Sequence, residues 1–328
     1  MTNVPLRRIL VSAGKIGISC ALLAVIAAKI NFAVIAAEWR SLDAPIIATS
    51  LLALLAEISV IAGVRLKLVL DVIGTRRPVG KLLQVVMSGF FFEQVAFGFL
   101  GGDSMRFLQM RRFDVSTKHA LGAIVIDRAL GMVSLLALAL LGLPGLVRIV
   151  SSLGPQVIEF AGAIVLVFAI AVASVFFTRI SEWFVRNVYS ELTNLWSRLQ
   201  ADRQLRGRVC GAIGLAFLTQ LLNVLVFALI GRAFHLDIAP LDWLFIVPPV
   251  LLVSMIPLSA GGWGLREASL IVILGDRGIP ADSAVIPSLI FGIFLILVTL
   301  PGGFLWLANR GTARKAAFGA VRHPLDAR

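Results

Sequence analysis

Long apolar segments recur along the whole chain, and they constrain the fold more than any other feature. Six of them reach about the 20 residues that an α-helix needs to cross a bilayer. They cover residues 16–37, 44–64, 119–143, 157–178, 209–231 and 284–307. Only 15% of the residues are charged, which is too few for the surface of a soluble domain. The runs are continuous rather than alternating, unlike the strands of a transmembrane β-barrel. We therefore predict an all-α polytopic membrane protein with six full spans, and we expect the first segment to be retained rather than cleaved.

Two further apolar stretches, about 82–104 and 243–276, are interrupted by glycines. Basic residues of membrane proteins concentrate in cytoplasmic loops. If both stretches crossed the membrane, the basic segments 102–119 and 179–208 would lie outside. If both stretches are re-entrant hairpins, which enter and leave on one side, most of the 30 Lys and Arg residues lie in the cytoplasm. We therefore expect two re-entrant helical hairpins, with both termini in the cytoplasm.

The order of these segments repeats in the two halves of the chain. Residues 1–155 and residues 156–328 each contain two spans, a hairpin and a span, in opposite orientations. Such inverted-topology repeats are typical of secondary transporters. A Gly-Gly pair followed by Arg occurs in both hairpins, at Gly101–Arg106 and Gly261–Arg266, and we expect each pair at the break of its hairpin. Two unrelated glycine turns are the alternative.

These two motifs indicate anion sites. Glycines allow the chain to break, and the helix that starts after a break points its N–H groups at it. An Arg nearby adds a planar fork for phosphate or carboxylate. The expected headgroup-binding residues are Gly101, Gly102 and Arg106 in the first hairpin and Gly261, Gly262, Gly264 and Arg266 in the second. Alternatively, Arg106 with Asp103 and Arg266 with Glu267 are static braces.

Several other ionisable residues fall inside apolar segments, where each costs about 2.5–3.5 kcal/mol on insertion scales. The residues expected to pair charges or to gate the site are Glu57, Glu93, Asp103, Asp127, Arg128 and Glu267. Asp127 and Arg128 are adjacent, so they point to different sides of a helix and each needs its own partner. Glu93 is a candidate partner for Arg128, and Asp127 is a candidate partner for Arg106.

Glu57 and Lys29 are single charges in apolar segments. Lys29 is near the far end of its span, from which its side chain can extend to the interface. Glu57 either faces a polar cavity or pairs with a basic group such as Lys29.

Residues 179–208 form an amphipathic segment between two spans. One side is apolar, and the segment carries six Arg residues. Such a helix lies on the membrane surface or packs against neighbours, and its arginines favour anionic lipids.

No motif for a chemical reaction is visible. The stretch from Gly74 to Lys81 resembles a P-loop, but its glycine spacing is one residue too long and Leu82 replaces the Ser or Thr. Ser259 has no histidine at comparable depth that would activate it. We therefore expect no enzymatic activity, no cofactor, no metal site and no nucleic-acid partner.

The second motif carries a family resemblance. The stretch from Pro257 to Glu267, PLSAGGWGLRE, resembles the P-x-S-x-G-G-x-G-x-R-E signature of the lysylphosphatidylglycerol synthase transmembrane (flippase-like) family, which includes YbhN-like integral membrane proteins. Gly102-Asp103 followed by Arg106, and the pair Asp127-Arg128, are similar to motifs of its first half. The chain departs from the family pattern at Gly131, where members often have Asp, and before Gly102, where Asn and Pro are usual.

The resemblance implies a protein that moves a lipid between leaflets, or that assists a pathway making a glycolipid, a hopanoid or an aminoacylated lipid. The chain resembles the membrane half alone, without an aminoacyl-transferase domain. We therefore predict a flippase-like transporter of the bacterial inner membrane for an anionic or phosphate-bearing (glyco)lipid headgroup. The alternative is a non-catalytic membrane subunit that scaffolds a glycosyltransferase or lipid-modifying enzyme, with 179–208 as the docking surface. A transporter of a small anionic solute is a third hypothesis.

Overall fold

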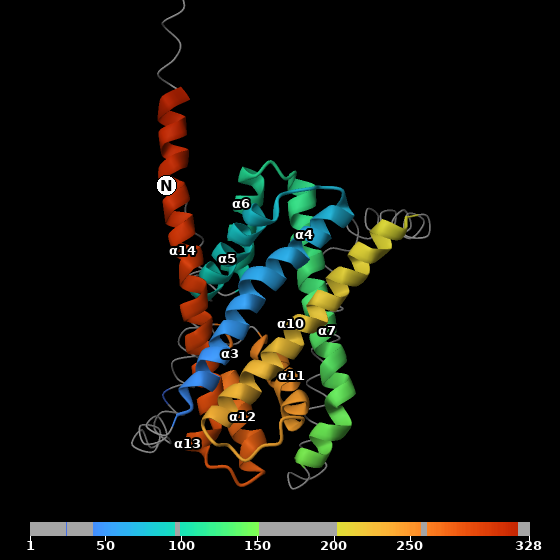
Figure 1. The fold of residues 1–328 in the computed structure, drawn as a ribbon, viewed down its shortest axis with the longest axis vertical. Helices are drawn as coiled ribbons and strands as arrows, with labels where there is room; N and C mark the ends of the chain where they lie inside the picture. Colours follow the sequence, from blue (N-terminus) through green and yellow to red (C-terminus); the bar gives the residue numbers. More distant parts are fainter. Residues whose placement is uncertain (1–23, 25–41, 96–98, 151–201, 257–260, 321–328) are drawn as a thin grey trace, which may run out of the picture.

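The computed structural model describes residue 24 and residues 42–95, 99–150, 202–256 and 261–320. Within these ranges, every regular element is a helix (Figure 1). The expected span 157–178, the expected span 16–37 except for residue 24, and residues 179–201 of the amphipathic segment lie outside the described residues. Residues 203–208 of that segment form the start of the helix Arg203–Ala233.

Four of the described helical stretches are long and apolar enough to cross a membrane. They are Ala44–Ile73, Thr117–Ile149, Arg203–Ala233 and Ala281–Ala308. Each contains one of the expected spans, namely 44–64, 119–143, 209–231 and 284–307. The prediction of an all-α, multi-pass membrane protein is therefore confirmed.

The first of these stretches is one continuous helix with a local distortion. It consists of α3 (Ala44–Ala56), a π-helical turn (Glu57–Ile61) and α4 (Ala62–Ile73). The Asp43 side chain caps its start by accepting the Ile46 N–H, which is the usual role of an N-cap aspartate. The helix ends at Gly74, whose φ of 96° is left-handed, as is common for a C-terminal glycine.

The helix continues past residue 64, where we expect the apolar span to end, and runs on to Ile73. This extension carries three charged residues, Arg65, Lys67 and Asp71. In the structure the Lys67 ammonium pairs with the Asp71 carboxylate one turn further along, and Arg65 is buried. Charges that are paired in this way do not end a helix; the first residue that does is Gly74.

Both expected hairpins are pairs of short helices. In the first, α5 (Val79–Val95) packs against α6 (Phe99–Arg112), and in the second, α11 (Asp242–Ser254) packs against α12 (Leu265–Gly275). The hairpins are followed by the long helices α7 (Thr117–Ile149) and, after the short α13 (Ala281–Ala284), α14 (Ile286–Ala320). The remaining long helix is α10 (Arg203–Ala233). The order long helix, hairpin, long helix thus occurs in both halves, and their inverted orientation stays a prediction.

The predicted chain break at Gly101 and Gly102 is wrong, because both residues lie inside α6. Gly102 serves close packing instead: a Cβ atom there would lie 2.8 Å from the Gly89 carbonyl oxygen and 3.0 Å from the Glu93 Cβ on α5. In the second hairpin the break is present, since Gly261, Gly262 and Gly264 precede α12 with φ of 61°, 79° and 90°. The two Gly-Gly motifs are therefore similar in sequence but differ in backbone conformation.

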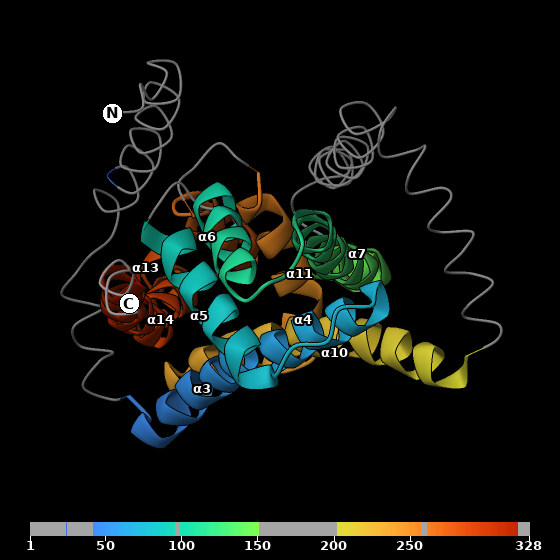
Figure 2. The ribbon, with the colours of Figure 1, turned by 90° about the horizontal axis from the view of Figure 1, so that it is seen from above.

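The first hairpin lies inside the molecule. In Figure 2, α5 and α6 lie between α14 and α7, with α3, α4 and α10 along one side. The contact between α5 and α14 is close: a Cβ atom on Gly302 would lie 2.2 Å from the Met87 carbonyl oxygen, and the Ser88 hydroxyl donates to the Gly302 carbonyl at 3.2 Å. Helix α14 thereby joins the second half of the chain to the first hairpin.

Two main apolar clusters form the core. The larger one surrounds Phe227 and Trp243 and unites α3, α10, α11, α12 and α14. The smaller one surrounds Leu70 and Leu82, unites α4, α5, α6 and α7, and also includes Ala212 of α10. Of these helices, α4, α5, α6 and α7 carry the charged residues of the candidate site.

Candidate functional site

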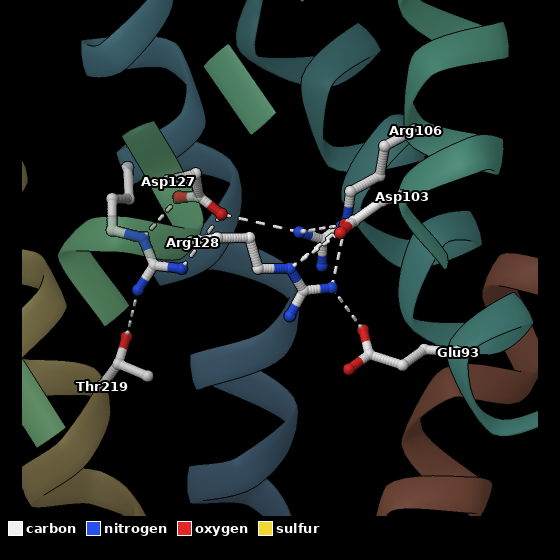
Figure 3. Close-up of polar contacts among 7 residues, drawn as sticks. Glu93, Asp103, Arg106, Asp127, Arg128 and Thr219 are labelled. Atoms are coloured by element: carbon white, nitrogen blue, oxygen red, sulfur yellow. Dashed lines mark hydrogen bonds and ion pairs between the residues drawn. The ribbon is translucent and has the colours of Figure 1, made fainter. Parts of the chain in front are cut away.

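Six charged side chains from four helices meet beside the first hairpin (Figure 3). They carry three positive and three negative charges. We call this set the charge network, and its members are Arg65 on α4, Glu93 on α5, Asp103 and Arg106 on α6, and Asp127 and Arg128 on α7. The sequence predicted five of these six as site residues, and the structure brings all five together.

The deepest pair is formed by Arg65 and Asp127. The Arg65 Nε donates to Asp127 Oδ1 at 2.7 Å and its Nη2 donates to Oδ2 at 3.3 Å. Both side chains are less than a tenth exposed. The Arg65 Nη1 also donates to the hydroxyl of Thr219 on α10, at 3.3 Å. A bidentate pair with a further hydrogen bond is the geometry that a buried arginine and carboxylate need to remain charged.

Arg128 joins α7 to both helices of the hairpin. Its Nη2 lies 2.9 Å from Glu93 Oε2 and 2.9 Å from Asp103 Oδ1, and its Nε also donates to the Asp103 carboxylate. The pairing of Glu93 with Arg128 that the sequence suggested is thus present. The Arg128 and Asp103 side chains are 23% and 26% exposed, so the network is open on this side.

Arg106 lies between these two pairs, but it is held loosely. Its Nη1 is 3.5 Å from Asp127 Oδ2 and 3.9 Å from Asp103 Oδ1, so the suggested pairing with Asp127 is present at long range. Its Nε is buried and has no hydrogen-bond partner among the described residues. One turn further along α6, the buried Oε1 of Gln109 also lacks a partner there. Unpaired buried polar atoms are rare in folded proteins and require a physical explanation.

Helix α5 leaves room for the Arg106 side chain and contacts its guanidinium. The guanidinium lies over the ring of Phe90, with 4.6 Å from Cζ to the ring centroid. A Cβ atom on Gly89 would lie 2.5 Å from both Cγ and Nε of Arg106. Only a glycine at position 89 therefore lets the arginine side chain run across α5 in this conformation.

The second motif has a different structure. Arg266 Nε donates to the Ser288 hydroxyl at 2.6 Å, and Nη2 donates to the Ser288 carbonyl at 3.0 Å and to Glu267 Oε1 at 3.1 Å. The other Glu267 oxygen accepts the Gly264 N–H at 2.6 Å. Arg266 and Glu267 are 3% and 0% exposed. These contacts are those of a static brace between α12 and α14.

Aromatic rings complete this brace. The Arg266 guanidinium lies between Trp263, at 5.4 Å, and Phe291, at 5.2 Å. Gly292 makes room for it, because a Cβ atom there would lie 2.7 Å from the Arg266 Nη2. Within the described residues, no ion pair or hydrogen bond links Arg266 to the charge network.

Glu57 also lies apart from the network. It is 5% exposed, and its carboxyl group has no hydrogen bond or ion pair among the described residues. Lys29, its suggested partner, lies outside the described residues.

Sequence reasoning missed three residues that complete these sites, namely Arg65, Thr219 and Ser288. Arg65 lies just past the expected end of its span at residue 64, although the first helix-stop signal after it is Gly74. That signal was sufficient to place Arg65 inside the helix. Nothing in the sequence marks Thr219 or Ser288, since a single hydroxyl in an apolar helix usually bonds its own backbone.

Comparison with known proteins gives one match. The sequence model of a family described as the lysylphosphatidylglycerol synthase TM region matches residues 12–302. This range includes the charge network, the Arg266 brace and Glu57. No curated protein and no solved structure matches the chain.

Proposed function

This chain belongs to the lysylphosphatidylglycerol synthase TM region family, and from this premise we propose that it is a flippase-like transporter. It moves an anionic or phosphate-bearing (glyco)lipid headgroup between the leaflets of a bacterial inner membrane, and the charge network is its headgroup site. The observation that carries the proposal is the state of Arg106, which is buried, has an Nε without a hydrogen-bond partner among the described residues, and pairs with carboxylates there only at 3.5 and 3.9 Å.

A headgroup phosphate supplies what Arg106 lacks. A buried donor without a partner costs about 1–3 kcal/mol, and a phosphate or carboxylate can accept two parallel hydrogen bonds from one guanidinium. An anion at Arg106 therefore recovers this cost and replaces two weak ion pairs by a bidentate contact. This difference favours binding at Arg106 over any other arginine of the network.

The network can also release Arg106 without leaving a carboxylate unpaired. Asp103 is held more closely by Arg128, at 2.9 Å, and Asp127 is held more closely by Arg65, at 2.7 Å. An incoming anion that displaces both carboxylates from Arg106 therefore exposes no bare negative charge, which would be costly in a buried site. The partly exposed side of the network, at Arg128 and Asp103, is the proposed entrance.

Arg266 has a structural role in this proposal. Its guanidinium is already bonded to Ser288 and Glu267, so an anion would have to break those contacts. We therefore place the headgroup at the first hairpin only and assign the second motif to holding α12 against α14. This assignment narrows the sequence-based hypothesis of one anion site in each hairpin.

The same proposal includes the orientation of the chain. In Figure 1, the α4–α5 and α6–α7 connections and the start of α10 lie at one end of the molecule. This end is rich in basic residues, which are Arg76, Arg77, Lys81, Arg111, Arg112, Lys118, Arg203, Arg206 and Arg208. Basic residues near span ends favour the cytoplasmic side of a membrane. We therefore place this end of the molecule in the cytoplasm, which supports the expectation of cytoplasmic termini.

The sequence shows no ATP-binding motif. We therefore propose that transport is passive or is driven by an ion gradient or by voltage, which supplies about 2.3 kcal/mol per charge per 100 mV.

Proteoliposomes of phosphatidylethanolamine and phosphatidylglycerol test the proposal. Fluorescent phosphatidylglycerol in the outer leaflet is quenched by dithionite, so the inner-leaflet fraction reports movement. We expect the wild type to move the probe, Arg106→Ala to lose this activity, and Arg277→Ala, which removes a half-exposed arginine far along the chain, to retain it. Equal movement by Arg106→Ala would overturn the assigned site.

The same assay distinguishes lipid transport from the alternative function as a scaffold. If the wild type never changes the leaflet distribution of any phospholipid probe, the transport proposal fails. Capture of a glycosyltransferase or lipid-modifying enzyme that is lost on charge reversal of 179–208 would then support the scaffold.

A further inference from the structure

Glu57 is a buried acidic residue that the headgroup site does not use. Its side chain is 5% exposed, and the next residue, Ile58, belongs to the apolar cluster that contains Met87 and Phe227. An ionised carboxylate in such surroundings is costly unless it is paired. No described residue pairs with it, so a neutral, protonated carboxyl is the state that fits this environment.

Among the described residues, the parts of the helices that pack near Glu57 carry no other titratable group. Helices α5 and α10 pack against the π-helical turn, and α14 packs against α3. No ionisable side chain occurs in residues 82–92 of α5, 211–231 of α10 or 286–308 of α14. The charged group of the described chain that acts on Glu57 is Arg65, further along its own helix.

The π-helical turn sets how Glu57 and Arg65 face each other. In a regular α-helix, residues eight apart differ by about 80° in direction. The turn Glu57–Ile61 holds one extra residue, since the Ala62 N–H bonds to the Glu57 carbonyl. The two residues therefore behave as if they were seven apart, with a difference of about 20°. By this geometry the two residues lie on one face of an ideal helix, about 10–12 Å apart along the axis. Helical side chains lean toward the N-terminus, which is the direction of Glu57 for Arg65 and the direction away from Arg65 for Glu57, so closing the distance depends on the Arg65 side chain.

We propose that the Glu57 carboxyl is the proton-binding site of this transporter and that Arg65 links it to the headgroup site. The inference rests on the proposed function. Glu57 holds its proton while Arg65 is paired with Asp127. When the headgroup leaves and Asp127 pairs with Arg106, Arg65 turns toward Glu57, the Glu57 O–H bond breaks, and the proton passes to water. The resulting carboxylate pairs with the Arg65 guanidinium, so Asp127 and Glu57 each keep a partner.

The local geometry permits this exchange. Arg65 is held by two bonds to Asp127 and by one to the Thr219 hydroxyl, all of which end on side chains that can rotate. The exchange therefore needs only rotations of side chains and does not require the helix to unfold.

Infrared difference spectroscopy of the reconstituted protein reads the proton directly. We expect the wild type at neutral pH to show the C=O band of a protonated carboxyl, Glu57→Gln to lack it, and Glu93→Gln to retain it. A band that persists in Glu57→Gln belongs to another group and overturns the proposal, and so does its absence from the wild type. A band that emerges only in Lys29→Met would show that Glu57 is ionised and paired with Lys29, which also overturns it.

Coupling is tested in the same phosphatidylethanolamine and phosphatidylglycerol vesicles with fluorescent phosphatidylglycerol. One proton exchanged per lipid allows a gradient of one pH unit to shift the leaflet distribution by up to about tenfold. We expect such a shift in the wild type and an equal distribution with and without the gradient in Glu57→Gln. A wild type that ignores the gradient overturns the coupling. If no lipid moves at all, the proposed function fails, while the infrared band still decides whether Glu57 binds a proton.

Discussion

Arg65 and Asp127 join α4 to α7 through two parallel hydrogen bonds, of 2.7 and 3.3 Å, in the interior of the protein. Neither residue is more than 7% exposed. Arg106 and Asp127 are equally buried, but their ion pair is long, at 3.5 Å. The Arg65–Asp127 pair is therefore the buried pair of the network with close, bidentate contact, and it carries the strongest stability prediction, because removal of one partner strands the other charge.

We expect Arg65→Ala to destabilise the protein by about 3–5 kcal/mol, because it leaves the Asp127 carboxylate buried and without its bidentate partner. The double variant Arg65→Met/Asp127→Leu should recover most of this loss, because apolar replacement of both partners is often neutral or stabilising. Thermal unfolding in detergent measures both effects, with Arg277→Ala as a surface control. Equal destabilisation of the single and double variants would contradict the importance of this pair.

Much of the fold was readable from the sequence, for reasons that individual segments show. A run such as 119–143 predicts a helix by length and hydropathy alone, and the observed Thr117–Ile149 contains it. Adjacent charges such as Asp127 and Arg128 require separate partners in any helix, so their pairing followed from geometry. These inferences depend only on local periodicity and on the cost of an unpaired charge.

What the sequence did not provide is the tertiary role of each glycine. Gly101-Gly102 and Gly261-Gly262 look alike, but the first pair is helical and the second forms a turn. The difference lies in the facing helix, since Gly102 packs against Gly89 and Glu93 of α5. Whether a glycine is there for a bend or for a close approach depends on the neighbour, which a single sequence does not identify.

The packing role of Gly102 leads to a second prediction. We expect Gly102→Ala to destabilise the protein by about 1–3 kcal/mol, because the new methyl group overlaps the Gly89 carbonyl and overpacking has this cost. Gly214→Ala in α10 is the matched control, since a Cβ atom there meets nothing within 4 Å. It should be neutral or stabilising by up to about 1 kcal/mol, as expected for alanine in place of glycine in a helix. Thermal unfolding distinguishes the two, and identical behaviour would refute the close contact.

The two motif arginines should differ in what their removal does to stability. Arg266→Ala leaves Glu267, which is 0% exposed, without its guanidinium, and we expect a loss of about 3–5 kcal/mol or failure to fold. Arg106→Ala leaves each of its carboxylates with another arginine, so the loss should be smaller. Ser288→Ala, which removes the acceptor of Arg266 Nε, should cost about 1–3 kcal/mol. Melting temperatures in one detergent rank the three variants, and a greater loss for Arg106→Ala than for Arg266→Ala would reverse the assignment of brace and binding site.

The last prediction concerns lipids that stay bound through purification in mild detergent. Because Arg106 has an unpaired Nε beside two displaceable carboxylates, we expect the wild type to retain an anionic phospholipid above its share in the membrane. Folded Arg106→Ala should lose this enrichment. Arg106→Lys should recover little of it, because an ammonium group cannot form the parallel bonds of a guanidinium. Mass spectrometry of the extracted lipids provides the comparison, with Arg277→Ala as the control for a lost surface charge. An unchanged lipid profile in a folded Arg106→Ala protein would mean that the anion binds elsewhere, and it would move the search for the headgroup site to the partly exposed Arg128.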